Sequence, residues 1–190
     1  MFSKQDPNAA SRTPRKKVVA SAAVIAVAMV FLNVSPANAY QLTGCKFPQR
    51  IMYVESSGVP SGKWSESLGS AITQVRDRTN ATLISRSTGQ ISTEARLYGN
   101  TGWNAQATWW CFLGATSSAK IEMNRSASEM ANGTAARVSL TWQHEFGHAL
   151  GLAHIDNTSR VMYGKGTQTP WNLGIRNLTA GDIRGINALY

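Results

Sequence analysis

The sequence predicts an α/β (α+β) domain. With 190 residues the chain has room for one ordinary globular domain, and a composition that is 43% apolar and 15% charged suits a packed core. Short stretches with strand-like alternation fill the middle of the chain, an amphipathic helix follows the first of them, and two helical stretches come last. The predicted order is strand, helix, several strands and then two helices, with no repeat or linker that would indicate a second domain.

The first 39 residues have the three parts of a secretory signal peptide. A basic start is followed by an apolar run from Val18 to Val34 and then by Ala37-Asn38-Ala39, which has the small-x-small form of a cleavage site. Cleavage there makes Tyr40 the first residue of a secreted domain, residues 40–190, without stable membrane association. An uncleaved membrane anchor is the alternative, but the run lies at the short limit for spanning a bilayer.

The net charge of the domain argues against a nucleic-acid partner. Loss of residues 1–39 lowers the formal net charge from +9 to +5, because this segment holds five basic residues and one acid. The remaining Lys and Arg residues are scattered and form no basic cluster. We therefore expect no nucleic-acid partner. We also expect a soluble monomer.

Five strands and a helix are expected in the first two thirds of the domain. Residues Arg50 to Val54 alternate in polarity and precede a turn-rich segment, so they predict the first strand. A helix is predicted from Trp64 onward, because apolar residues recur there at helical spacing. Short apolar runs separated by Gly, Asn and Ser predict four further strands: Ala81–Ser85, Ile91–Tyr98, Ala107–Leu113 and Lys120–Met123.

Three tryptophans, Trp103, Trp109 and Trp110, lie close to Cys111 in the sequence. Such a group could line a substrate cleft. Packing against a core or a sheet is the commoner role of tryptophan, so we expect a packing role here.

Two helices complete the predicted domain. One runs from Thr134 to Leu150, with Asn132 or Thr134 as its N-cap. The other begins at Thr179, because Thr179 and Asp182 have the spacing of a capping box. Its buried stripe is predicted to consist of Ile183, Ile186 and Leu189.

Residues 144–154, HEFGHALGLAH, contain all three histidines of the chain. His144 and His148 are four residues apart on the predicted helix, so their imidazoles can bind one tetrahedral metal ion. Gly151 can adopt a left-handed conformation that ends the helix and returns His154 toward the same ion. Three protein ligands leave the fourth position of a zinc ion to water, as in catalytic rather than structural sites.

Glu145 supplies the base that such a site requires. Zinc lowers the pKa of a bound water to about 7 and polarises a carbonyl, and Glu145 can take the proton from this water and transfer it to the leaving amine. The alternative is that the histidines only make local hydrogen bonds, but HExxHxxGxxH fixes five positions. The sequence therefore predicts a zinc-dependent endopeptidase with one catalytic Zn²⁺.

Residues 144–154 match the zinc-binding signature of the metzincins, and the segment that follows resembles the matrixin branch. Arg160-Val161-Met162-Tyr163 is similar to the Met-turn, in which Met162 would lie under the zinc ligands. We do not assign Tyr163 to the metal, because the ligating tyrosine of astacins and serralysins lies two residues after the methionine. The C-terminal segment resembles the last matrixin helix, in which the acid matching Asp182 hydrogen-bonds to the Met-turn.

The resemblance implies a metzincin-like domain with a twisted, mostly parallel mixed sheet, an active-site helix and a C-terminal helix. Protein or peptide substrates would bind in extended form along an edge strand, from either Gln106–Leu113 or Lys120–Met123. The loop from Gly164 to Asn177 would form a wall of the specificity pocket.

The sequence also departs from the matrixin pattern. Matrixins often carry a second, structural zinc and several calcium ions, whereas residues 81–143 contain no histidine and only three acids, Glu94, Glu122 and Glu129. We therefore expect no second zinc and leave calcium binding open.

Cys45 and Cys111 are the two cysteines of the exported part. An even number in an oxidising compartment favours one disulfide, which could replace some of the stabilising effect of calcium. Alternatively, Cys45 could keep the enzyme latent by binding the metal as a thiolate, but its neighbours do not match the matrixin latency segment.

The alternative from another functional class is a binding protein without peptidase activity. The chain could be a secreted zinc-binding protein that binds peptides or surface polymers without cutting them. Glu145 argues against this alternative, because a protein that only binds has no need of a base beside the metal.

Overall fold

A computed structural model describes residues 40–190. The predicted signal peptide, residues 1–39, lies outside the described residues, and so does the apolar run that could act as a membrane anchor. None of the helices within residues 40–190 combines the length and the apolar character that crossing a bilayer requires.

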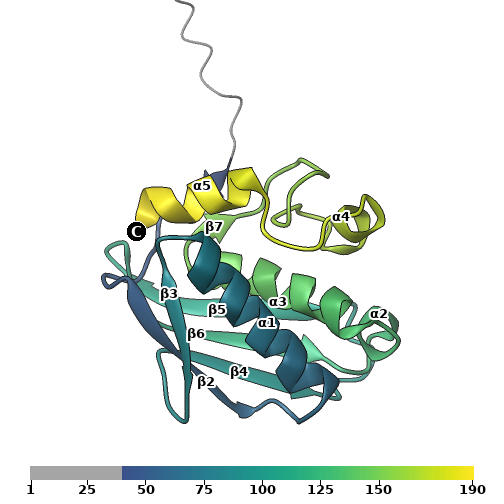
Figure 1. Ribbon diagram of the computed structural model, residues 1–190. Coiled ribbons are helices and arrows are strands. Elements are labelled where there is room, and N and C mark those ends of the chain that lie inside the picture. The colour runs from purple at the N-terminus through teal and green to yellow at the C-terminus, as the bar shows by residue number, and fades with distance from the viewer. Residues whose placement is uncertain (1–39) are drawn as a thin grey trace, which may run out of the picture. The chain divides into compact units, whose positions relative to one another are not determined.

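Five strands form a mixed sheet. They are β2 (Ile51–Gly58), β3 (Thr82–Arg86), β4 (Ile91–Arg96), β5 (Ala105–Phe112) and β6 (Ala115–Asn124). Their order in the sheet is β3-β2-β4-β6-β5 (Figure 1). Neighbouring strands are parallel except at one edge, where β5 is antiparallel to β6. The predicted fold class, an α/β (α+β) domain with a mixed and mostly parallel sheet, is confirmed.

Only one of the two segments expected to offer an edge to a peptide does so. Strand β5, which contains most of Gln106–Leu113, lies at an edge and pairs only with β6. Strand β6 contains Lys120–Met123 and is paired on both sides, with β4 and β5. The prediction for Lys120–Met123 is therefore wrong, because its backbone groups are already used within the sheet.

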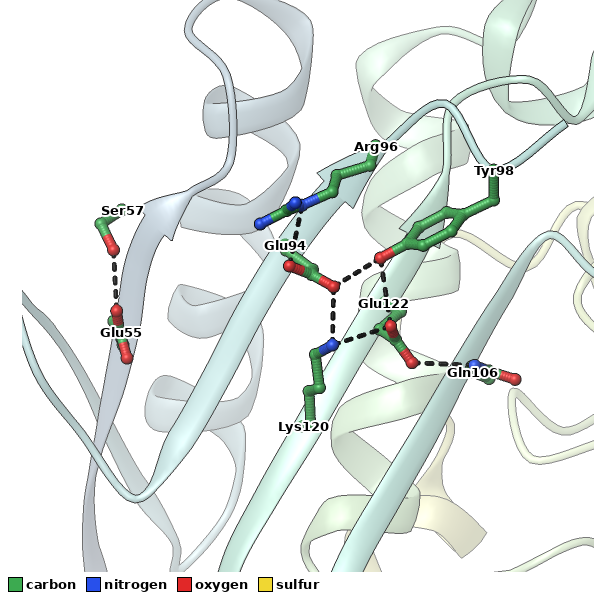
Figure 2. Close-up of polar contacts among 8 residues, drawn as sticks. All are labelled: Glu55, Ser57, Glu94, Arg96, Tyr98, Gln106, Lys120 and Glu122. Carbon is green, nitrogen blue, oxygen red and sulfur yellow. Dashed lines mark hydrogen bonds and ion pairs between the residues drawn. The ribbon is translucent and has the colours of Figure 1, made fainter.

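The two faces of the sheet differ in polarity, as alternation along the strands requires. One face is built from buried apolar residues: Met52, Val54, Leu83, Ile91, Ala95, Ile121 and Met123. On the other face, Lys120 Nζ lies 2.7 Å from the carboxylate of Glu94 and 2.9 Å from that of Glu122 (Figure 2). The Tyr98 hydroxyl donates hydrogen bonds to both carboxylates. This network connects β4 with β6 across the outer face.

Two long helices cover the apolar face of the sheet. They are α1 (Lys63–Arg78) and α3 (Ala135–Ala149), which also pack against each other (Figure 1). Helix α1 buries Leu68, Ala71, Ile72 and Val75 at helical spacing, as predicted, and Trp64 is partly buried. Of the two predicted N-caps of α3, Thr134 is the correct one, because its Oγ1 accepts a hydrogen bond from the backbone N–H of Arg137 at 3.2 Å. Helix α3 is buried along nearly its whole length, so the residues it carries lie inside the domain.

The remaining elements are short. They are β1 (Gln41–Leu42), α2 (Ser128–Ala131), β7 (Leu152–Ala153), α4 (Gln168–Asn172) and α5 (Ala180–Leu189). The sequence predicted only α5, and the capping box between Thr179 and Asp182 is formed. The other four elements are too short to show a hydrophobic period.

The N-terminal segment of the domain is fixed at three points. Strand β1 is antiparallel to β7, and Cys45 forms a disulfide with Cys111 of β5. Cys45 is therefore not a free thiolate in this structure. The ring of Tyr40 lies against Gly185 of α5, where a Cβ would come within 2.8 Å of the Tyr40 Cβ. Since β7 directly precedes His154, these contacts support the chain next to the histidine cluster.

Candidate metal centre

The structure brings His144, His148 and His154 together around one point. The distance between Nε2 atoms is 3.2 Å for His144 and His148, 3.2 Å for His144 and His154, and 2.9 Å for His148 and His154. The first two rings come from consecutive turns of α3, and the third comes from the segment after β7. Among residues 40–190, these three form the group of ligand-type side chains that could hold a metal ion.

The other ring nitrogens fix how these rings are protonated. His144 Nδ1 lies 2.6 Å from the carbonyl oxygen of Val161, and His148 Nδ1 lies 2.9 Å from that of Leu152. A carbonyl oxygen can only accept a hydrogen bond, so both Nδ1 atoms carry the proton. The Nε2 atoms of these rings then present lone pairs toward His154. Two lone pairs that face each other repel, and a cation bound between them would remove this repulsion.

A zinc ion fits this donor set. Imidazole nitrogens bind zinc at about 2.0–2.1 Å, and tetrahedral geometry then places two such nitrogens about 3.3 Å apart. The observed separations are close to this value. The carbonyl partners on Nδ1 also match the outer contacts that orient metal-binding histidines.

Burial keeps the histidines in the neutral form that binds metal. Burial and the nearby imidazole of His148 lower the pKa of His144 to about 3, against the opposing effect of its hydrogen bond to Val161. Burial also lowers the pKa of His148 to about 4 and shifts the pKa of His154 downward. No proton therefore competes with a metal ion for these rings near pH 7.

Gly151 allows the chain to return toward the other two histidines for two reasons. Its φ angle is 107°, in the region that a Cβ disfavours, as the sequence predicted. In addition, a Cβ at this position would lie 2.3 Å from the carbonyl oxygen of Cys45. This second reason depends on the N-terminal segment, so the motif alone could not reveal it.

Met162 lies beneath the histidine-bearing helix. Its side chain is 2% exposed and fills the space beside Gly147, where a Cβ would be 2.3 Å from the Met162 sulfur. The backbone N–H groups of Val161 and Met162 donate to the carboxylate of Asp182 at 3.1 and 3.5 Å. Asp182 also accepts the capping-box hydrogen bond from Thr179, so one carboxylate serves both the helix cap and the turn.

Glu145 lies in a cleft of about 780 Å³ that the three histidines also line. It is 5% exposed, and no residue in the described part of the chain forms a hydrogen bond or an ion pair with its carboxylate. Burial raises the pKa of Glu145 to about 8. A nearby cation would oppose this shift by stabilising the ionised form. A carboxylate with no structural partner, placed beside a metal position, can act as a proton acceptor.

The packing role expected for the three tryptophans holds for Trp109, which packs against the core, but not for Trp110. Trp103 and Trp109 line the cleft, and the ring of Trp109 stacks on that of His148 with centroids 6.2 Å apart. Trp110 is 54% exposed on the opposite side of β5. The core prediction is wrong for Trp110, because successive residues of a strand point to opposite faces of the sheet.

The cleft also contains Thr141, which the sequence did not single out, and Thr167, which it included only within a longer segment. Thr141 of α3 lines it one turn before Glu145, and Thr167 lines it from the loop after the turn of Met162. From the predicted wall Gly164–Asn177, residues 164–167 line the cleft, and the following residues fold into α4. Helical spacing relative to Glu145 could have indicated Thr141, whereas Thr167 was expected only as an unnamed member of the predicted wall.

Comparisons with known proteins agree with this geometry. The family model for matrixins matches residues 62–190. A protein of Spodoptera frugiperda ascovirus 1a named "Putative matrix metalloproteinase" is 40% identical over 60 residues. That match covers 30% of this chain and 16% of the viral protein. The range matched by the family model contains Glu145, Met162 and the three histidines.

Proposed function

Because the chain belongs to the matrixin family, we propose that residues 40–190 form a secreted zinc-dependent endopeptidase. The observation that carries this proposal is the convergence of three Nε2 atoms, 2.9–3.2 Å apart, in the same cleft as an unpaired Glu145. Metal ligands alone could serve a structural site. A carboxylate without a structural partner beside them supports catalysis.

The residues of the cleft have distinct roles in this proposal. His144, His148 and His154 hold the metal, and a bound Zn²⁺ supplies a Lewis acid that polarises the scissile carbonyl and makes water acidic. Glu145 accepts the proton of the attacking water and donates it to the departing amine. Met162 supports the ligands from below as an apolar floor.

The substrate is an extended peptide bound along the free edge of β5. This edge is suited to the task because β5 pairs on one side only and because Ala105, Gln106, Ala107 and Trp109 line the cleft. Main-chain hydrogen bonds to such an edge hold a peptide without regard to its sequence. Selectivity must then come from the pockets that receive the side chains.

Secretion is the second part of the proposal. Its support is the leader pattern that ends at Ala39 and the disulfide between Cys45 and Cys111, a bond that persists in oxidising compartments. N-terminal sequencing of protein recovered from the culture medium tests this part. Tyr40 is the expected first residue, and recovery with the membrane fraction would contradict it.

Peptidase activity is tested with exported protein made from the full chain. Wild type, Glu145→Ala and chelator-treated wild type are incubated with a denatured protein, and their zinc content is measured. We expect cleavage only by zinc-loaded wild type, with Glu145→Ala retaining about one zinc per chain but losing nearly all activity. A fully active Glu145→Ala enzyme contradicts the assigned base. A wild type that binds zinc and peptides without cleaving them supports the binding-protein alternative.

A further inference from the structure

Two buried threonines form the floor of the cleft beside Glu145. Thr141 lies one turn before Glu145 on α3, and Thr167 immediately precedes α4. Both line the cleft, and each is 3% exposed. A substrate side chain that enters the cleft next to Glu145 therefore meets two residues that carry hydroxyl groups.

Arg137 holds the two threonines from behind. Its Nη1 donates to Thr167 Oγ1 at 2.6 Å and to Thr141 Oγ1 at 3.3 Å. Its Nη2 lies 2.6 Å from the carboxylate of Glu129, which balances the charge of the guanidinium. The arginine is 4% exposed, so its position is fixed within the protein.

This group of three side chains has more hydrogen-bond donors than acceptors for the two hydroxyl hydrogens. The two threonine oxygens lie 2.9 Å apart, so one hydroxyl donates to the other. Arg137 can only donate, so it offers no acceptor for the second hydroxyl hydrogen. No other hydrogen bond involves these two hydroxyl groups within residues 40–190. One O–H group of this threonine pair therefore has no acceptor among the described residues, and a buried donor without an acceptor is unfavourable.

We propose that this hydroxyl selects a substrate side chain with a neutral acceptor oxygen, such as the amide of Gln or Asn. The inference rests on the proposed peptidase activity and names the side chain that one pocket of this enzyme accepts. A neutral amide is favoured over a carboxylate because Glu129 and Glu145 line the same cleft and the charge of Arg137 is already balanced. A site built to form a hydrogen bond discriminates strongly against a partner that cannot form it.

The test compares peptides that differ only in this acceptor. Cleavage sites in a peptide library first identify the substrate position with the strongest selectivity. Two peptides then carry Gln or Met at that position, since these side chains have similar length but only Gln offers an oxygen. We expect kcat/KM of the wild type to favour the Gln peptide at least tenfold.

Three variants test the hydrogen count. Thr141→Val removes one hydroxyl together with its bond to Thr167, so Thr167 still has one free hydrogen and the Gln preference should persist. Thr141→Ser keeps the hydroxyl and is the matched control, with the same preference. The triple variant Arg137→Met/Thr141→Val/Thr167→Val has no donor on the floor, and it should favour Met over Gln.

The possible outcomes separate this inference from the proposed function. An enzyme that cleaves proteins but prefers the Met peptide overturns the pocket inference and leaves the peptidase proposal intact. A zinc-loaded wild type that cleaves nothing overturns both. If the triple variant does not fold, the Gln to Met ratios of wild type and Thr141→Val decide, because a ratio of one or below in either protein contradicts the inference.

Discussion

Replacing Gly147 by Ala tests how closely the histidine-bearing helix lies on Met162. A Cβ at residue 147 would be 2.3 Å from the Met162 sulfur and 3.1 Å from its terminal carbon. Contacts between nonbonded atoms have their optimum near 3.5–4.0 Å, so the sulfur would have to move by about 1.2 Å or more. Overpacking of this kind costs about 1–3 kcal/mol, while the alanine itself favours the helix by about 0.5–1 kcal/mol. We expect a net loss of about 1–2 kcal/mol in the free energy of unfolding.

Urea denaturation of the metal-free protein measures this loss, and zinc titration shows whether the neighbouring ligands are disturbed. Gly69→Ala is the matched control, because Gly69 lies within α1 and a Cβ there has nothing within 4 Å. This control should gain stability by up to about 1 kcal/mol.

A double-mutant cycle assigns the effect to the contact itself. In a Met162→Ala background the sulfur and terminal carbon are gone, so Gly147→Ala should no longer be destabilising. The reasoning is refuted if Gly147→Ala alone is as stable as wild type and binds zinc equally well. It is refuted as well if the cost persists in the Met162→Ala background.

Three further predictions concern parts of the fold away from the cleft. Lys63 Nζ donates to three backbone carbonyls between residues 130 and 133 at 2.7–3.1 Å, so Lys63→Met should lower the free energy of unfolding by about 1–2 kcal/mol in urea denaturation. The disulfide closes a sequence separation of 66 residues, so the Cys45→Ser/Cys111→Ser variant should lose about 2–4 kcal/mol by the same measurement. Burial alone would raise the pKa of Glu94, but hydrogen bonds with Lys120 and other neighbouring side chains lower this pKa to about 2. The ionised Glu94 carboxylate therefore stabilises the fold above the ordinary carboxyl pKa. This stabilisation is lost as the pH falls from about 4.5 toward 2. As the pH is lowered through this range, the free energy of unfolding should decrease more steeply for wild type than for Glu94→Gln. Equal pH dependence in the two proteins would contradict the stabilising role of the Glu94 carboxylate.

The histidine cluster could be predicted because its geometry is local. His144 and His148 are separated by one helical turn, and Gly151 allows the return of His154, all within eleven residues. The neighbouring Glu145 follows from the same helix. Local spacing fixes such positions before any tertiary contact is known.

Beyond the edge strand and the wall segment, the individual contacts of the cleft could not be predicted, because they depend on distant segments. Thr167 meets Thr141 only after the loop beyond Met162 folds back onto α3, and their separation of 26 residues has no period. The order of the strands has the same origin. The sequence of β6 does not show whether this strand is central or at an edge. Only its pairing with both β4 and β5 excludes it as an edge that a peptide could join.

Val161 connects the C-terminal helix with the histidine cluster. Its carbonyl oxygen accepts the hydrogen bond of His144 Nδ1, while its own N–H donates to Asp182. Asp182 is in turn fixed by the cap of α5 through Thr179. A single residue therefore connects the cap of the last helix with the orientation of the His144 ring. The capping box could be recognised in the sequence from the spacing of Thr179 and Asp182. The second role of the Asp182 carboxylate, which is to accept hydrogen bonds from Val161 and Met162, depends on a turn about 20 residues earlier. The sequence alone therefore shows the cap but not the support that Asp182 gives to this turn.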